Sequence, residues 1–214
     1  MNTGSLSFKC SIVRGGTSKG IYILENELPT DPILREKVIL SIFGSPDIRQ
    51  IDGLGGADLL TSKCAIIGPP SILEADVDYT FAQVSIDEQH VEFNSNCGNI
   101  SAGVGPFAIN NGLVRAVEPL TNVRIHLKNI GKVITAEVPV INGKAAVDGD
   151  FEIDGVPGTG ARIALDWSNV IGGMTGKLLP TGNAMDIIEH EGRKFHVSIV
   201  DAGTISFFVP AEDM

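Results

Sequence analysis

The hydrophobic positions of the chain follow the two-residue period of strands over most of its length. Alternating or continuous apolar runs predict strands over residues 8–13, 21–24, 64–67, 77–86 and 91–93. Between residues 114 and 147, short β-rich runs joined by Asn-Gly and Asn-Ile-Gly turns predict hairpins. Two last strands are predicted over residues 195–200 and 205–209. The chain is therefore expected to be built mainly from sheet.

Two segments have the pattern of helices instead. After Pro32, apolar residues recur at helical spacing up to Phe43, and Gly44 follows as the expected terminator. The run from Ile100 to Ile109 carries no charge, which predicts a buried helix that starts near residues 96–98. Strand patterns flank this run on both sides. We therefore expect an α+β domain whose strands wrap a mostly buried helix.

Cys97 stands at the predicted start of the buried helix. Backbone N–H groups at a helix start have no partner and can stabilise a thiolate or a bound carboxylate. Cys97 is therefore a candidate acid/base or nucleophile. The alternative is a small buried hydrophobic residue, as most free cysteines are. The polar neighbours Asn96, Gly98 and Asn99 favour the first interpretation, because a structural cysteine does not need them.

Composition limits the classes of partner. The 214 residues include 26 acidic and 16 basic ones, which gives a net charge of −10 without any basic run, so a nucleic-acid partner is not expected. A small anion is not excluded, because donors gathered in a cleft act at short range. The three widely spaced cysteines suggest neither a disulfide framework nor a zinc site. The absence of a long apolar run, and of a signal-like start over residues 1–5, predicts a cytoplasmic protein without a membrane segment.

The tripeptide Thr-Ser-Lys occurs twice, each time after glycines and before a predicted strand. The copies are Thr17-Ser18-Lys19 and Thr61-Ser62-Lys63. Neither is a nucleotide P-loop, because that motif places Gly-Lys-Ser/Thr in order before a helix. Each turn could hold an anion, or be an ordinary hairpin with a lysine at its tip. Lys63 adjoins a buried strand, where burial would favour the neutral amine of a base, although a strand-end lysine can also reach solvent.

Six motifs in order resemble those of the PrpF family. They are 14–20 (RGGTSKG), 52–56 (DGLGG) with 61–63 (TSK), 77–79 (VDY) with 83–84 (QV), 96–99 (NCGN) with 101–107 (SAGVGPF), 179–183 (LPTGN) and 200–203 (VDAG). That family contains 2-methylaconitate cis-trans isomerases, methylitaconate Δ-isomerases and 4-oxalomesaconate tautomerases. The resemblance implies a diaminopimelate epimerase-like fold, in which two similar halves each wrap strands around a central helix.

The resemblance also implies roles for the candidate residues. Cys97 falls where this fold keeps a cysteine at the central helix, and Lys63 matches the lysine to which the family assigns proton transfer. The substrate would be a small anionic polycarboxylate of the 2-methylaconitate or 4-oxalomesaconate type, isomerised without metal or organic cofactor. The residues expected to bind its carboxylates are Thr17, Ser18, Lys19, Thr61, Ser62, Gly98 and Asn99.

Family members are considerably longer than 214 residues. The resemblance therefore implies an N-terminal epimerase-like domain over residues 1–192 and the start of a second half over residues 193–214. Without the rest of that half, we expect the chain alone to isomerise poorly, and its last two strands to fold back or to pair in a homodimer. A non-catalytic binding or accessory module and an inactive fragment are the alternative interpretations.

Overall fold

The computed structural model describes residues 6–214, so the expectation about residues 1–5 lies outside the described part. The chain divides into two compact units, Met1–Leu165 and Asp166–Met214. Across the described residues, no helix combines the length and the apolar character needed to cross a membrane.

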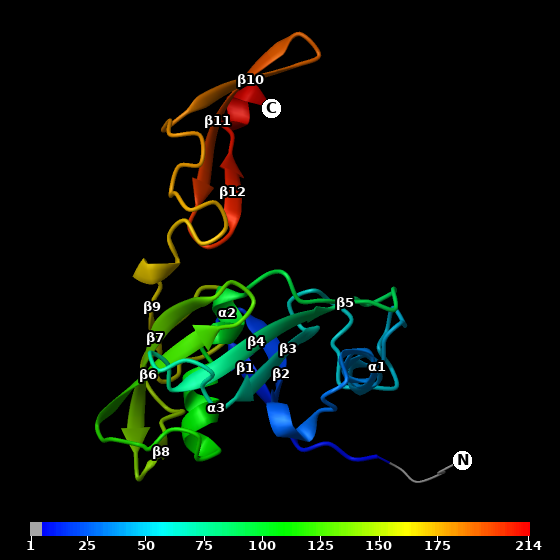
Figure 1. Ribbon diagram of the computed structural model, residues 1–214, viewed down its shortest axis with the longest axis vertical. Helices are drawn as coiled ribbons and strands as arrows, with labels where there is room; N and C mark the ends of the chain where they lie inside the picture. The colour runs from blue at the N-terminus through cyan, green and yellow to red at the C-terminus, as the bar shows by residue number, and fades with distance from the viewer. Residues whose placement is uncertain (1–5) are drawn as a thin grey trace. The chain divides into compact units, whose positions relative to one another are not determined.

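The first unit is built on one mixed sheet (Figure 1). Its strands lie in the order β1-β2-β3-β4-β6-β7-β8, with β5 beside β4 and β9 beside β7. Most neighbours are antiparallel, but β2 pairs with β3, and β4 with β6, in parallel. The strands are β1 (Cys10–Gly15), β2 (Ser18–Leu24), β3 (Lys63–Gly68), β4 (Val77–Val84), β5 (Val91–Glu92), β6 (Leu120–Leu127), β7 (Lys132–Ile141), β8 (Lys144–Ala145) and β9 (Ala164–Asp166).

Helix α1 (Pro32–Phe43) confirms the first helix prediction at both ends. The carboxylate of Asp31 accepts a hydrogen bond from the backbone N–H of Leu34, and Gly44 ends the helix in the left-handed conformation at φ 77°. The helix packs an apolar face against one side of the sheet. The buried cluster there includes Val38, Ile39, Leu40 and Phe43 from the helix and Ile21, Ile23, Cys64, Ile66, Ala82 and Val84 from the strands.

The second helix prediction is confirmed at its start and corrected in its length. Cys97 is the N-cap of α2 (Gly98–Ser101), but after one turn the segment is interrupted and continues as α3 (Val104–Asn110). Pro106 has no N–H, so one bond of a continuous helix cannot form. Gly103, at the interruption, lies against Tyr22: a side-chain carbon added there would stand 2.4 Å from the tyrosine oxygen.

The two short helices occupy the other side of the curved sheet from α1 (Figure 1). Helix α2 contacts β1 and β2, while α3 contacts β3, β6, β7 and β8. Ile100, Val104, Ala108 and Ile109 are buried among these strands. The strands therefore wrap the helical segment, as the apolar run between strand patterns predicted.

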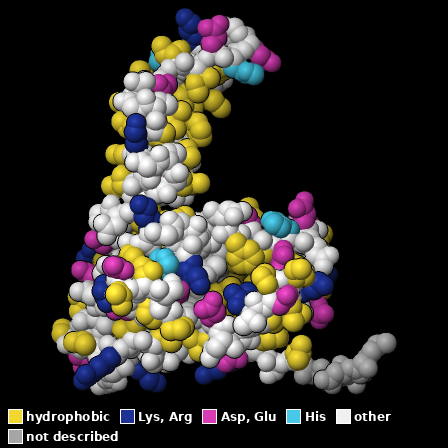
Figure 2. Space-filling model, in the orientation of Figure 1, with side chains coloured by type: hydrophobic (Ala, Val, Ile, Leu, Met, Phe, Trp, Pro, Cys, Tyr) yellow, Lys and Arg dark blue, Asp and Glu magenta, His cyan; other side chains and the backbone are white. Residues whose placement is uncertain are grey.

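The second unit contains a three-stranded antiparallel sheet of β10 (Asp186–His190), β11 (Arg193–Asp201) and β12 (Ile205–Phe208). The boundary predicted between residues 192 and 193 falls in the turn of the β10–β11 hairpin, whose pairing holds both sides of that boundary in one unit. Apolar side chains are exposed on this sheet, among them Ile187, Phe207 and Phe208, and hydrophobic side chains follow it in Figure 2. That this unit begins a second half stays a prediction.

Candidate functional site

The two Thr-Ser-Lys turns lie side by side, because each lies at the start of one of two paired parallel strands. Gly20 of β2 lies opposite Lys63 of β3, and the backbone N–H of Lys19 donates to the carbonyl of Leu60 at 2.9 Å. Neighbouring parallel strands start at the same end of a sheet. The pairing therefore brings both turns together at one end of the sheet of the first unit.

Asn99 in α2 joins the first turn to the helical segment. Its side-chain amide donates to the hydroxyl oxygens of Thr17 at 3.0 Å and Ser18 at 3.2 Å. Ser18 is 2% exposed, whereas Thr17 is open to solvent. Since each hydroxyl oxygen accepts a hydrogen from Asn99, its own hydrogen is free to donate elsewhere. The Thr17 and Ser18 hydroxyls, which Asn99 holds in place, thus form a preorganised pair of donors suited to a carboxylate.

The glycines before this turn allow α2 to approach so closely. A side-chain carbon at Gly15 would stand 2.2 Å from the Asn99 carbonyl oxygen, and one at Gly16 would stand 2.3 Å from the Asn99 side-chain oxygen. Gly16 also has φ of 54°, a conformation that strains other residues. The glycines are required by contact with α2 as well as by the turn.

Cys97 caps α2 through its backbone and is half-buried. Its carbonyl accepts from the backbone N–H of Ser101 at 3.0 Å and from the Ser101 hydroxyl at 2.9 Å. No side chain caps the helix, so the N–H groups of Gly98 and Asn99 have no partner inside it. Burial raises the pKa of both Tyr22 and Tyr79, with a smaller contribution from neighbouring Cys97. Two buried phenols therefore lie near the cysteine.

Lys63 is 8% exposed, although it carries an amine. Its Nζ donates to Oε1 of Gln83 at 2.7 Å and lies 5.3 Å from the centroid of the Phe81 ring. Because side chains alternate along a strand, Lys63 shares a sheet face with Gly20, its neighbour on β2, and hence with Ser18 and Tyr22. The Tyr22 hydroxyl donates to the Ile100 carbonyl, so this is the face covered by α2. Lys63 and Ser18 thus lie on one face beside α2.

The other three predicted binding residues have different surroundings. Ser62 is fully buried and donates to Oε1 of Gln50 at 2.8 Å, so its hydroxyl secures the preceding loop. Lys19 and Thr61 both approach Gly56: a side-chain carbon there would stand 3.3 Å from the lysine Nζ and 2.2 Å from the threonine hydroxyl oxygen. Alternation along β2 turns Lys19 away from the face of Ser18. Their roles in binding stay predictions.

A cavity of about 650 Å³ adjoins the first turn and α2. Gly16, Gly98 and Asn99 line it together with Arg14, whose guanidinium donates to the Gly16 carbonyl at 2.9 Å. Neither Lys63 nor Cys97 lines this cavity. Most of its remaining wall is apolar, from Phe107, Phe151 and Ile163 among others. The convergence of Lys63 and Cys97 on one pocket therefore stays a prediction.

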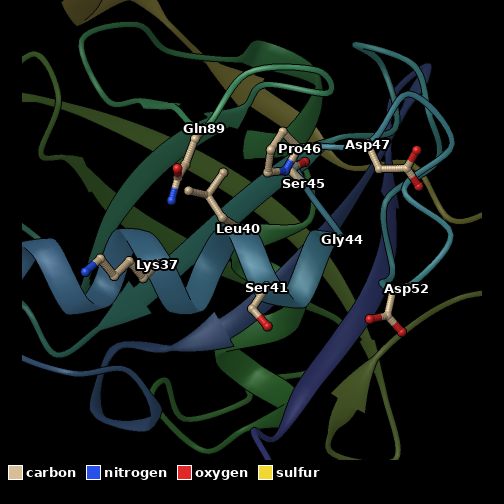
Figure 3. Close-up of a pocket in the computed structure, with 9 residues that line it drawn as sticks. All are labelled: Lys37, Leu40, Ser41, Gly44, Ser45, Pro46, Asp47, Asp52 and Gln89. Carbon is tan, nitrogen blue, oxygen red and sulfur yellow. The ribbon is translucent and has the colours of Figure 1, made fainter.

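Two other features of the described part of the first unit lie outside the predicted site residues. Asp78 and Ser71 both lie at Nδ1 of His126, at 2.9 and 3.4 Å, whereas a catalytic triad uses both ring nitrogens. A hollow of about 390 Å³ near the C-terminal end of α1 contains none of the predicted site residues (Figure 3). Within residues 6–214, no three His, Cys, Asp or Glu side chains are grouped to hold a metal ion.

Comparison with known proteins assigns the chain to a family. The model of the family described as PrpF protein matches residues 6–214. The chain belongs to the PrpF family. This confirms the resemblance inferred from the six motifs.

Curated relatives in this family are isomerases by name. The chain is 60% identical to the 3-methylitaconate isomerase of Eubacterium barkeri, over 96% of this chain and 54% of that protein. It is 48% identical to the 4-oxalomesaconate tautomerase of Pseudomonas putida, over 99% of this chain and 57% of that protein. The chain thus spans about half the length of the curated relatives it matches.

Solved structures confirm the predicted fold class. A crystal structure of methylitaconate-delta-isomerase matches with a TM-score of 0.86 and 59% identity, over 96% of this chain and 53% of that one. A hydroxyproline epimerase from Agrobacterium vitis matches with a TM-score of 0.52 at 13% identity, over 95% of this chain and 52% of that one, and shows the fold alone. The diaminopimelate epimerase-like architecture is therefore present in this PrpF chain.

Sequence reasoning did not assign Gln83 and Gln50 to the site. Gln83 contacts Lys63, while Gln50 is 1% exposed and accepts from both Ser62 and the backbone N–H of Ala57. A signal existed for Gln83, because residues 83–84 (QV) belong to one of the six motifs. Recognising its partner required the β3–β4 register, which places it opposite Lys63.

Proposed function

We propose that the protein containing this chain is a cofactor-independent isomerase of an unsaturated polycarboxylic acid. One observation carries the proposal. A buried lysine without a carboxylate partner among the described residues lies on the same sheet face as the Ser18 hydroxyl, which accepts from the Asn99 amide of α2. Such a set can bind an anionic acid and exchange one of its protons.

The proposed chemistry moves a double bond by two proton transfers. Lys63 removes a proton from the carbon allylic to the double bond, and the electrons pass through that double bond into the conjugated carboxylate as a dienolate. Donors from Thr17, Ser18 and the free backbone N–H groups of Gly98 and Asn99 in α2 stabilise the developing charge. A proton then returns two carbons away, from Lys63 or from Cys97. Every proton and electron pair remains within the substrate and these side chains, so the reaction consumes no cofactor.

The substrate class is supported by the names of the relatives. Methylitaconate and oxalomesaconate are unsaturated acids with more than one carboxylate, which would occupy several donors at once. Thr17 and Ser18, whose hydroxyl oxygens accept from Asn99, would hold one carboxylate, and Arg14 at the adjoining cavity is a candidate for another. Residues outside this chain would complete the binding of the substrate.

The test is an exchange assay on the protein containing this chain. Methylitaconate, oxalomesaconate and 2-methylaconitate are offered in deuterated water, with and without chelator, while ultraviolet absorbance and deuterium incorporation are followed. We expect at least one acid to isomerise with deuterium in the product, at equal rates in both conditions. Loss of activity with chelator would overturn the cofactor-free mechanism. Binding of the acids without exchange would instead support a non-catalytic binding module.

A further inference from the structure

We propose that Gln83 is a positioning residue that fixes the rotation of the Lys63 amine, so that its lone pair faces the substrate. The proposal rests on the proposed isomerase function. Gln83 lies on β4 directly opposite Lys63 of β3, and its Oε1 is 2.7 Å from the lysine Nζ. It is the one amide that the structure places against this amine among the described residues.

The amide of Gln83 is itself held in one orientation. Its Nε2 donates to the carbonyl of Ser62 at 2.9 Å and to the carbonyl of Leu59 at 3.2 Å. Reversing the amide would place oxygen against these two carbonyl oxygens and lose both bonds. The loop before β3 thus fixes Gln83, and Gln83 presents only its acceptor oxygen to Lys63.

The Gln83 oxygen restricts the rotation of a neutral Lys63 amine more usefully than that of a charged one, because only the neutral amine has a lone pair to direct. A neutral amine has two hydrogens and one lone pair, and hydrogen bonding of one hydrogen to Gln83 leaves the lone pair a restricted set of directions. The base therefore meets the substrate proton without a search over rotations, which is the kind of preorganisation that increases rate. A charged partner would act differently, because a carboxylate at this place would hold the proton on the amine.

No charged side chain among the described residues pairs with Lys63, so Gln83 is the main polar neighbour of its amine. On β4 the amine faces Gln83 and the Phe81 ring. On β2 the neighbouring cation Lys19 alternates to the other face. In the preceding loop, the Asp58 side chain accepts from the backbone N–H of Leu60, and α2 has no charged residue. None of the ion pairs formed by the described residues includes Lys63.

The experiment compares Gln83→Glu and Gln83→Leu with wild type in the protein containing this chain. Gln83→Leu removes the acceptor, and we expect kcat to fall about tenfold or more with KM changed less. Gln83→Glu keeps an acceptor of the same length and adds a negative charge, while it loses the two bonds from Nε2 to the Ser62 and Leu59 carbonyls. It should move the acid limb of the kcat/KM profile upward by about one pH unit or more. Gln89→Glu, an exposed change of the same charge, is the matched control and should leave the profile in place.

A second readout separates this proposal from the proposed function. Acetic anhydride labelling of Lys63, followed by peptide mass spectrometry across pH, reports on the amine even if no acid is isomerised. Gln83→Glu should shift the midpoint of labelling upward, while Gln89→Glu should not. If wild type fails to isomerise any acid yet this shift appears, only the enzymatic function is lost. An unshifted midpoint and acid limb in a folded Gln83→Glu protein would overturn the positioning role.

Discussion

The two Thr-Ser-Lys turns have the same sequence but expose different side chains to the buried helices. Strands β2 and β3 pair with Gly20 opposite Lys63, so Ser18 is level with Thr61 and Lys19 with Ser62. The second copy is thus displaced by one residue relative to the first. Because side chains alternate, this displacement exchanges the faces. The first turn presents a serine toward α2, and the second presents a lysine.

This difference shows that a repeated motif need not mean a repeated role. One copy supplies hydroxyl donors that Asn99 holds in place, whereas the other supplies a buried amine that Gln83 holds. The remaining serine and lysine have other neighbours: Ser62 donates to Gln50, and Lys19 lies near Gly56. One face of the sheet therefore obtains two kinds of group from one tripeptide.

The largest expected effect separates the two lysines. Lys63→Met should lower kcat by about 10³-fold, because a positioned acid/base group contributes about 10²–10⁴-fold. Lys19→Met should leave kcat within about threefold, since that side chain faces away from Ser18. Steady-state kinetics on the most active of the three acids measures both. Equal losses in the two variants would contradict the assignment of different faces.

A smaller effect should separate the two serines. Ser18→Ala removes a donor to a charged carboxylate, and we expect KM to rise about tenfold or more. Ser62→Ala should instead lower the free energy of unfolding by about 1–2 kcal/mol, because the buried Gln50 loses a partner. Thermal melting and kinetics of both variants give the comparison. If the Ser62→Ala protein melts like wild type but binds substrate poorly, Ser62 would be a substrate-binding residue rather than a structural one.

Gly16, which precedes the first Thr-Ser-Lys turn, provides a test of how closely this turn packs against α2. Gly16→Ala and Gly131→Ala both place alanine at positive φ, 54° and 63°, which costs about 1–2 kcal/mol. At Gly131 the added carbon has open space, but at Gly16 it meets Asn99. Gly16→Ala should therefore be less stable than Gly131→Ala in urea unfolding and also raise KM. Equal free energies of unfolding for the two variants would mean that α2 can move to accommodate the added carbon without a loss of stability.

The smallest expected effect on activity concerns Asp78, at the opposite end of β4 from Gln83. Burial tends to raise the pKa of Asp78, but hydrogen bonds from Ser71 and His126 and the nearby Lys128 outweigh it, so the pKa is lowered. A lowered pKa in the folded state stabilises the fold above the ordinary aspartate range. This contribution disappears as pH falls through that range and below it.

Asp78→Asn should therefore flatten the fall of the melting temperature between about pH 5 and pH 3. The rate of isomerisation at neutral pH should stay within about twofold, because this cluster lies outside the proposed site. A wild-type melting curve that does not respond to acid would contradict the lowered pKa. A large loss of activity in Asp78→Asn would mean that the functional site extends along β4 as far as Asp78.

The sequence predicted the parts of the fold that local signals determine. Helix α1 carries its own N-cap, its proline and its terminal glycine, so both ends were predictable. The start of α2 at Cys97 was also predictable from the change of polar to apolar residues. Its interruption was not, because the close contact of Gly103 with Tyr22 is a tertiary one.

The site was predicted as a set of residues but not as an arrangement. Ser62 and Lys63 adjoin in the sequence, yet their faces follow from a strand register that no local signal contains. The bond from Ser62 to Gln50 depends on a loop in which Gln50 adopts a φ of 46°. The pairing of Lys63 with Gln83 likewise requires β4 to be in place.

The parallel pairing of β2 with β3 has a consequence for the order of folding. Its register joins residues 43 positions apart, and the bond from Asn99 to Ser18 spans 81 positions. Closing such long loops lowers the entropy of the chain before any contact can compensate for it, so contacts between distant residues form late. The donors around Ser18 should therefore assemble after the local β1–β2 hairpin and α1. An intermediate that already contains these two elements would still be unable to bind a carboxylate.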